Sequence, residues 1–362
     1  MTSLQKINRI LFFMLGIYGL FYFGSSFLIP LVFGVFFASL VSPLCNLIEK
    51  ARIPRIIASF ISTLVIFIVV GGVMYLFIYQ LSLFVTDLSI IRREFLVIIE
   101  NLRDQLTSMT GISLEDQQRI WQERSGDVIN TLESSITKIL SDVASTIFSF
   151  MLVLLYVFLF TYYRDKFAGF VMMYTTENKK ENMGKIMEKV GRVVYHYLWG
   201  RAKVMALLAV MYYITFLIFD IPFAVLLTIF GALVTIIPYV GPFVSGLLPI
   251  FFSIIFMDST ATIILFSSII VSIQLIESYV FEPLVIGSEV KLNPLMVIIA
   301  IIMGGMIWGL AGMFLFVPMF AMLKIVARHS QGLEPLAYVM GPSREKPHSG
   351  KNGTNVSEAG NA

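Results

Sequence analysis

The sequence is poor in cysteine and in charge. Cys45 is the only cysteine among 362 residues, so the chain forms neither an intrachain disulfide nor a thiol-ligated metal site. Charged residues make up 14% of the chain, whereas hydrophobic residues make up 57%. Soluble globular domains do not have this composition. The sequence therefore predicts an all-α polytopic membrane protein that binds no nucleic acid.

Motifs of several enzyme classes are also absent. The sequence contains no GxxxxGK[ST] motif for nucleotide phosphates, and neither HExxH nor GxSxG for hydrolysis. The three histidines, His196, His329 and His348, lie at or beyond the ends of apolar runs. We therefore expect a protein that is not an enzyme, an intramembrane hydrolase included, and that uses no cofactor and no metal.

Hydrophobic segments, about eight in number, approach or exceed the roughly 20 residues that cross a hydrocarbon core. Three lie in residues 1–84, a fourth in 144–163, and the others in a membrane core at 204–328. Basic residues precede the first segment, as in a signal peptide, but a second follows at once, so we expect the first to be retained. The segments are Ile10–Ile29, Leu31–Ile48, Ile56–Leu83, Ala144–Tyr163, Val204–Phe219, Phe223–Phe256, Thr260–Phe281 and Leu295–Val326.

Lysine and arginine gather in alternate connections between these segments. By the positive-inside rule, those connections face the cytoplasm, and so do both termini. The tail at 329–362 is then cytoplasmic, and its polar composition predicts disorder from about residue 341. The basic residues on this side include Lys6, Arg9, Lys50, Arg52, Arg55, Arg164, Lys166, Lys179, Lys180, Lys185, Lys189, Arg192, Arg201, Lys203, Lys324 and Arg328.

Two amphipathic regions lie outside the apolar segments. Residues 85–143, on the other side of the membrane, carry apolar residues at helical spacing and predict an external helical arm that supports assembly. The alternative is an arm whose stripes pack within one subunit. A cytoplasmic amphipathic helix region is predicted at 164–203, with the helix from about Asn178 to Trp199 lying in the membrane interface.

Two apolar segments are broken by proline and glycine. The first, Phe223–Phe256, would be about 50 Å long as one straight helix, which is more than a bilayer requires. Paired interruptions point to the binding region of a transporter, whereas close helix packing is the alternative reason for the glycines. The residues predicted to line the pathway are Pro238, Gly241, Pro242, Gly246, Gly304, Gly305, Gly309 and Gly312.

The stretch LVTIIPYVGPFVSGLLPI predicts that the first broken segment reverses direction at Pro238–Gly246. Non-helical backbone is tolerated at membrane depth only where protein covers it or where it lines a watery cavity. We therefore interpret this segment as a re-entrant hairpin that lines the solute path. A kinked helix that crosses the membrane fully is the alternative.

Polar residues also occur between the two broken segments. Gln274 and Glu277 are three residues apart and share one face of a helix, and Glu282 follows just before Pro283. A carboxylate within a span is costly and is a candidate functional group. We predict Glu277, and then Glu282, as a proton or sodium site. The alternative places both glutamates at the membrane interface, where they cost little.

The motifs IIPYVGP, QLIESYVFEPLVIG, LNPLMVIIAIIMGG and WGLAGMFLFVPMFAMLK resemble the autoinducer-2 exporter family, the PerM-like permeases of bacteria. The resemblance covers nearly the whole membrane part and is strongest between Gly231 and Lys324. It implies a homo-oligomer in the bacterial inner membrane, with a pentamer as one form, that exports small molecules. It also implies that some members exchange sodium for protons. The family pattern contains no catalytic residues to carry over.

Three functions follow from these features. The first is a secondary transporter or efflux permease for small molecules that an ion gradient drives. The second is a sodium/proton antiporter of the same family, and the third is a membrane scaffold that transports nothing. The broken segments disfavour the scaffold, because a scaffold has no need of irregular backbone at membrane depth.

Overall fold

The computed structural model describes residues 3–87, 93, 131, 134–176, 180–286, 292–330 and 332–342. Every regular element in this part of the chain is a helix, which confirms the all-α prediction. Six of the helices found there are long and apolar enough to cross a membrane, and shorter apolar helices accompany them. Most of the predicted arm at 85–143 and the tail from residue 343 lie outside the described residues.

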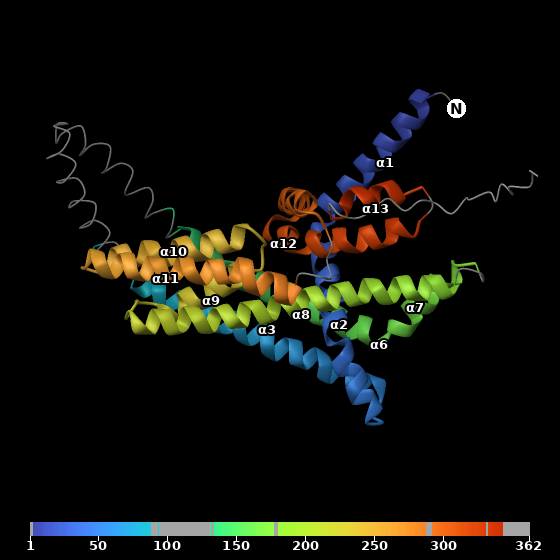
Figure 1. The fold of residues 1–362 in the computed structure, drawn as a ribbon. Coiled ribbons are helices and arrows are strands. Elements are labelled where there is room, and N and C mark those ends of the chain that lie inside the picture. Colours follow the sequence, from blue (N-terminus) through green and yellow to red (C-terminus); the bar gives the residue numbers. More distant parts are fainter. Residues whose placement is uncertain are drawn as a thin grey trace, which may run out of the picture.

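The first two helices, α1 (Ser3–Phe23) and α2 (Ser25–Lys50), differ from the prediction. The predicted boundary between Ile29 and Leu31 is wrong, because α2 is helical through Pro30. The actual boundary is Gly24, where helical hydrogen bonding continues: its N–H donates to the carbonyl of Leu20 at 2.9 Å. Figure 1 shows α1 leading into the start of α2, with its amino-terminal part projecting away from the other helices.

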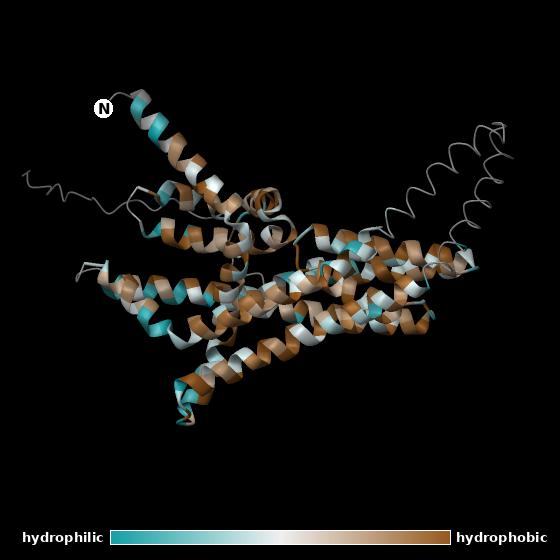
Figure 2. Ribbon diagram, turned by 180° about the vertical axis from the view of Figure 1, so that it is seen from behind, coloured by the Kyte–Doolittle hydropathy of each residue, from teal (hydrophilic) through white to brown (hydrophobic). Residues whose placement is uncertain are grey.

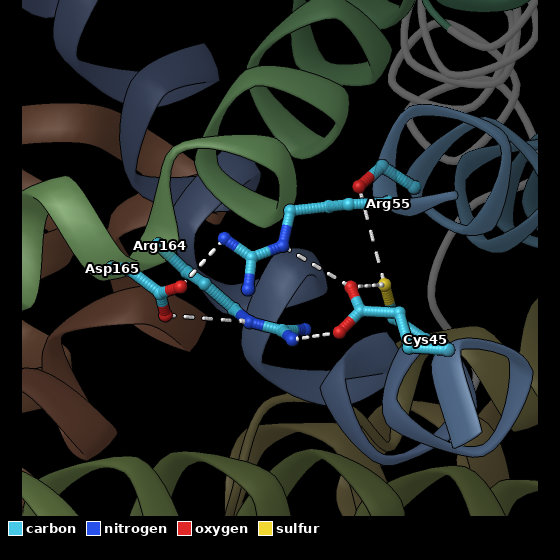
Figure 3. Close-up of polar contacts among 6 residues, drawn as sticks. Cys45, Arg55, Arg164 and Asp165 are labelled. Atoms are coloured by element: carbon cyan, nitrogen blue, oxygen red, sulfur yellow. Dashed lines mark hydrogen bonds and ion pairs between the residues drawn. The ribbon is translucent and has the colours of Figure 1, made fainter. Parts of the chain in front are cut away.

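A charged cluster joins the adjacent ends of α2, α3 (Arg55–Thr86), α6 (Val143–Tyr162) and α7 (Arg164–Met173). Glu49 pairs with Arg164 and, at 3.3 Å, with Arg55, while Arg55 reaches Asp165 at 2.6 Å. The thiol of Cys45 donates to Glu49 at 3.6 Å (Figure 3). Two carboxylates balance two guanidinium groups here, so we interpret the cluster as a structural clamp.

Glu49→Gln is expected to lower the free energy of unfolding by about 1 kcal/mol, because it removes the carboxylate that both arginines share. The loss is measurable as a lower thermal midpoint in detergent. Glu188→Gln is the matched control, since the Glu188 side chain is 67% exposed and pairs with the exposed Arg192, whereas the Glu49 side chain is 22% exposed. Equal stability of the two variants would show that the clamp contributes nothing measurable.

Helix α8 (Lys180–Ile218) is one continuous helix of 39 residues, about 58 Å long. It contains no proline, and exposed pairs four residues apart, such as Lys185 with Glu181, support its first turns. The sequence analysis treated Asn178–Trp199 and Val204–Phe219 as separate elements. In the structure both belong to one helix, so the first part does not form a helix of its own.

The first broken segment forms two helices, α9 (Ala224–Val234) and α10 (Val240–Phe256), which we call the first hairpin. Phe84, near the end of α3, stacks edge-on against Phe223 at 5.0 Å and lies 6.2 Å from Phe252 between ring centroids. Both ends of the segment therefore lie beside the same end of α3, and the chain reverses between them. The reversal falls at residues 235–239, where Tyr239 has a φ of 64°.

The second broken segment, α12 (Pro294–Arg328), also folds back on itself, and we call it the second hairpin. The chain bends at Gly309, whose φ of 59° and ψ of −140° favour glycine strongly. The backbones of Gly304 and Gly312 consequently lie against each other. The start of this segment is tied to α13 (Glu334–Met340), because the N–H of Asn293 donates to the carbonyl of Met340 at 3.1 Å.

The long helix α8 contacts both hairpins. Its first half contributes Val194, Tyr197 and Leu198 to a core cluster that includes residues of α2 and the second hairpin. Its second half contributes Val204 and Leu208 to a cluster with the first hairpin and with α11 (Thr260–Ile276). Figure 2 shows hydrophilic residues at the amino-terminal end of α1, at the α2–α3 junction and around α7, with mainly hydrophobic helices between these ends and the opposite end of the molecule.

The hairpin geometry makes the topology testable. With Cys45 replaced by serine, a cysteine introduced at Ser259 should react with an impermeant thiol reagent in intact cells, whereas one at Ser288 should be protected. If each hairpin returns to the side of the membrane on which it starts, α11 crosses the membrane between them. Ser259, before α11, then faces the outside, and Ser288 is expected to face the cytoplasm. The reverse labelling pattern would show that both segments cross the membrane. Ser288 itself lies outside the described residues.

Candidate functional site

The candidate site lies where α8, α10 and α11 meet, and it begins with a small hydrogen-bonded group. The amide nitrogen of Gln274 on α11 donates to the hydroxyl of Tyr212 on α8 at 2.6 Å and to that of Ser245 on α10 at 3.0 Å. We call these three residues the amide cluster. Gly246 lies against the same side chain: a Cβ added there would be 3.1 Å from the Gln274 amide nitrogen. The cluster thus fastens the first hairpin to the two helices beside it.

The next helical turn after Gln274 changes geometry. Glu277 begins η2 (Glu277–Ile286), a π-helix that continues directly from α11. Such i→i+5 segments are rare, and they occur frequently at functional sites. The wider π-helical turn changes the direction in which the following side chains point. Glu277 and Glu282 both belong to this short segment.

Glu277 and Glu282 share the site with an arginine of α8, and we call the three residues the charge triad. A guanidinium nitrogen of Arg201 (Nη1) donates to Glu282 at 2.8 Å. Arg201 is 1% exposed and Glu277 is 0% exposed, whereas the Glu282 side chain is 32% exposed. The charges of Arg201 and Glu282 both act on Glu277. Taking charges out of water is costly, so this burial requires a reason beyond stability.

Several buried polar atoms in and next to the triad have no hydrogen-bond partner among the residues that the structure describes. They include both carboxylate oxygens of Glu277, two nitrogens of Arg201 (Nε and Nη2), the hydroxyl of Tyr197 and the side-chain oxygen of Gln274. Buried polar groups are normally paired, and each exception calls for an explanation. Donors and acceptors that are buried together without partners are suited to bind an ion or the polar part of a solute.

The predicted site residues divide between three places. Gln274, Gly246, Glu277 and Glu282 lie in or against the amide cluster and the charge triad. Pro238 and Gly241 lie at the reversal of the first hairpin, where Gly241 contacts the backbone of residues 234 and 235. The glycines at 304, 305, 309 and 312 form the bend of the second hairpin.

One part of the prediction for the first hairpin is wrong. Pro242 and Gly246 do not break the chain, because α10 runs through both. Pro242 lies in the first turn of α10, where the missing N–H has no intrahelical partner to lose. The reversal is accordingly shorter than predicted and precedes most of the Pro238–Gly246 cluster.

Arg201, Tyr212 and Ser245 were missed by the sequence analysis, which assigned Arg201 to the cytoplasmic charges. A signal for Arg201 was present. The buried face of α8 repeats at intervals of three and four residues through Tyr197, Arg201, Val204 and Leu208, so the arginine interrupts an apolar stripe. A single charge within such a stripe points to the interior of the protein.

Comparison with known proteins agrees with this architecture. Residues 11–332 match the family described as AI-2E family transporter. The YueF protein of Bacillus subtilis (strain 168) is 25% identical over 322 residues, which cover 83% of this chain and 84% of that protein. The AI-2 transport protein TqsA of Escherichia coli (strain K12) is 22% identical over 320 residues, covering 88% and 90%. The chain belongs to the AI-2E transporter family and is a multi-pass membrane transporter.

Proposed function

We propose that this transporter is an efflux permease of the bacterial inner membrane that exports small molecules and is driven by an ion gradient. The observation that carries the proposal is Glu277, a carboxyl group with 0% exposure and no hydrogen-bond partner among the described residues, within the candidate membrane span Thr260–Glu282. A buried ionisable residue of this kind marks an ion pathway by default. The protein does no enzymatic chemistry in this proposal, and it needs no cofactor.

The two hairpins supply the solute path. Discontinuous helices expose amide and carbonyl groups at membrane depth, and transporters build their binding regions from them. The tip of the first hairpin carries Ile237, which belongs to the same core cluster as Ala300 and Ile301 of the second. A rearrangement of either hairpin is therefore transmitted to the other and to α8. Both termini lie in the cytoplasm, and the transporter works as a homo-oligomer, for which a pentamer is one form.

Glu277→Gln is expected to reduce gradient-driven flux to background while the protein still folds, because the substitution keeps the shape of the side chain and removes its charge. The measurement is flux in proteoliposomes, with sodium and a small panel of candidate solutes, under imposed proton and sodium gradients. Glu188→Gln, which changes an exposed carboxylate of α8, is the matched control and should transport normally.

The outcomes of this assay separate the functions. Flux of a solute in the export direction supports the efflux permease. Sodium flux driven by a proton gradient, without any solute, favours the sodium/proton antiporter. Well-folded wild-type protein that gives no flux under any gradient would point to the membrane scaffold. Full activity of Glu277→Gln at every pH would remove Glu277 from the ion pathway.

A further inference from the structure

We infer that the ion bound at the charge triad is a single proton on the carboxyl group of Glu277, and that Arg201 receives the carboxylate when the proton leaves. The inference rests on the proposed function and specifies its coupling ion. It follows from the charge of the triad, from the kinds of atoms that surround Glu277, and from the N–H groups of Arg201 that donate no hydrogen bond to a described residue.

If both carboxylates are ionised, the charge triad has one negative charge more than positive charges. Glu277 and Glu282 are two carboxylates, and Arg201 supplies one guanidinium. The neighbouring helices do not correct this, because α10 and α11 contain no charged residue. Among the described residues, the phenols of Tyr197 and Tyr212 on α8 are further titratable groups next to the triad. One added proton makes the buried group neutral, and an unpaired charge there would be costly.

The same surroundings favour a proton over a metal ion. Hard cations are held by several oxygen ligands, but the described residues contain no group of three or more histidine, cysteine, aspartate or glutamate side chains suited to hold a metal. A guanidinium group next to Glu277 also repels a cation. Proton binding needs only one carboxylate oxygen, to which the proton bonds covalently.

Arg201 is arranged to serve as the counter-ion after the proton leaves. Nη1 donates to Glu282, whereas Nε and Nη2 are buried and have no partner in the described part of the chain. The ionised carboxylate of Glu277 can accept hydrogen bonds from these two nitrogens, and ion pairs of arginine with carboxylates are commonly bidentate. Loss of the proton therefore draws η2 towards α8, and binding of a proton releases it. The proton is thereby linked to a movement of the π-helical segment between the two hairpins.

Infrared difference spectroscopy of the purified protein in liposomes tests this inference without any solute. The carbonyl stretching band of a protonated carboxylic acid should be present in the wild type, disappear as the pH is raised, and be missing from Glu277→Gln. In Glu282→Gln the band should disappear at a lower pH than in the wild type, because Arg201 then balances the ionised carboxylate of Glu277 by itself. Saturating sodium chloride should not remove the band at a fixed pH.

Two results would overturn the inference. A titrating band that survives in Glu277→Gln would place the proton on another group. A band of the wild type that sodium removes at constant pH would show that the site binds sodium in exchange for the proton. The proposed function fails differently: if the band behaves as expected but no gradient drives flux, the proton site stands and the efflux permease does not.

Discussion

Arg201→Met is expected to lower the free energy of unfolding by about 3 kcal/mol, the lower end of the loss seen when one partner of a buried ion pair is removed. The reason is that Glu282 keeps its negative charge without the guanidinium group that now holds it at 2.8 Å. The partial exposure of Glu282 allows some hydration and limits the loss. Thermal and chemical unfolding in detergent give the measurement.

The stability of Arg201→Met should also depend on pH. The inferred proton leaves Glu277 at alkaline pH, so the variant then contains two carboxylates without a cation and should be less stable than at acidic pH. Adding Glu282→Gln should recover stability at every pH, because it removes the carboxylate that Arg201→Met leaves without its ion-pair partner. Adding Glu277→Gln should help only at alkaline pH. A loss that neither second substitution reduces would mean that Arg201 contributes by packing alone.

The fold was predictable where the sequence pattern is strong. Long apolar runs predicted the spans, and the Pro238–Gly246 cluster predicted that the first broken segment reverses, because such residues interrupt helices for local steric reasons. The exact ends were not predictable. Helix α10 continues through Pro249, since a neighbouring bundle stabilises a helix that an isolated proline would disrupt.

The site was predictable only in part, because its members come from distant parts of the chain. Gln274 and Glu277 share a helical face, and their spacing alone brings them together. Arg201 lies 81 residues before Glu282 in the sequence, and no local pattern indicates their contact. The positive-inside rule counts lysine and arginine in the connections near the ends of spans, so it could not separate a buried Arg201 from exposed neighbours such as Lys203.

The bend of the second hairpin should be the position least tolerant of change. Gly304→Ala is expected to destabilise the protein by about 3 kcal/mol, as overpacked sites do, and to abolish transport. A Cβ at this position would overlap the backbone carbonyl of Gly312, and backbone atoms cannot move aside as the end of a flexible side chain can. The two parts of α12 would have to separate at the point where the chain turns through Gly309.

The matched control for this prediction is Gly72→Ala, because a Cβ on Gly72 of α3 would meet no atom within 4 Å. Both substitutions add one methyl group to a helical glycine, and alanine favours a helix more than glycine does. Gly72→Ala should therefore fold and transport like the wild type, whereas Gly304→Ala should unfold at a lower temperature in detergent and give no flux in proteoliposomes. If Gly304→Ala matched the control in both measurements, the two legs of the second hairpin would not need to pack backbone against backbone, and the hairpin would not be a fixed wall of the solute path.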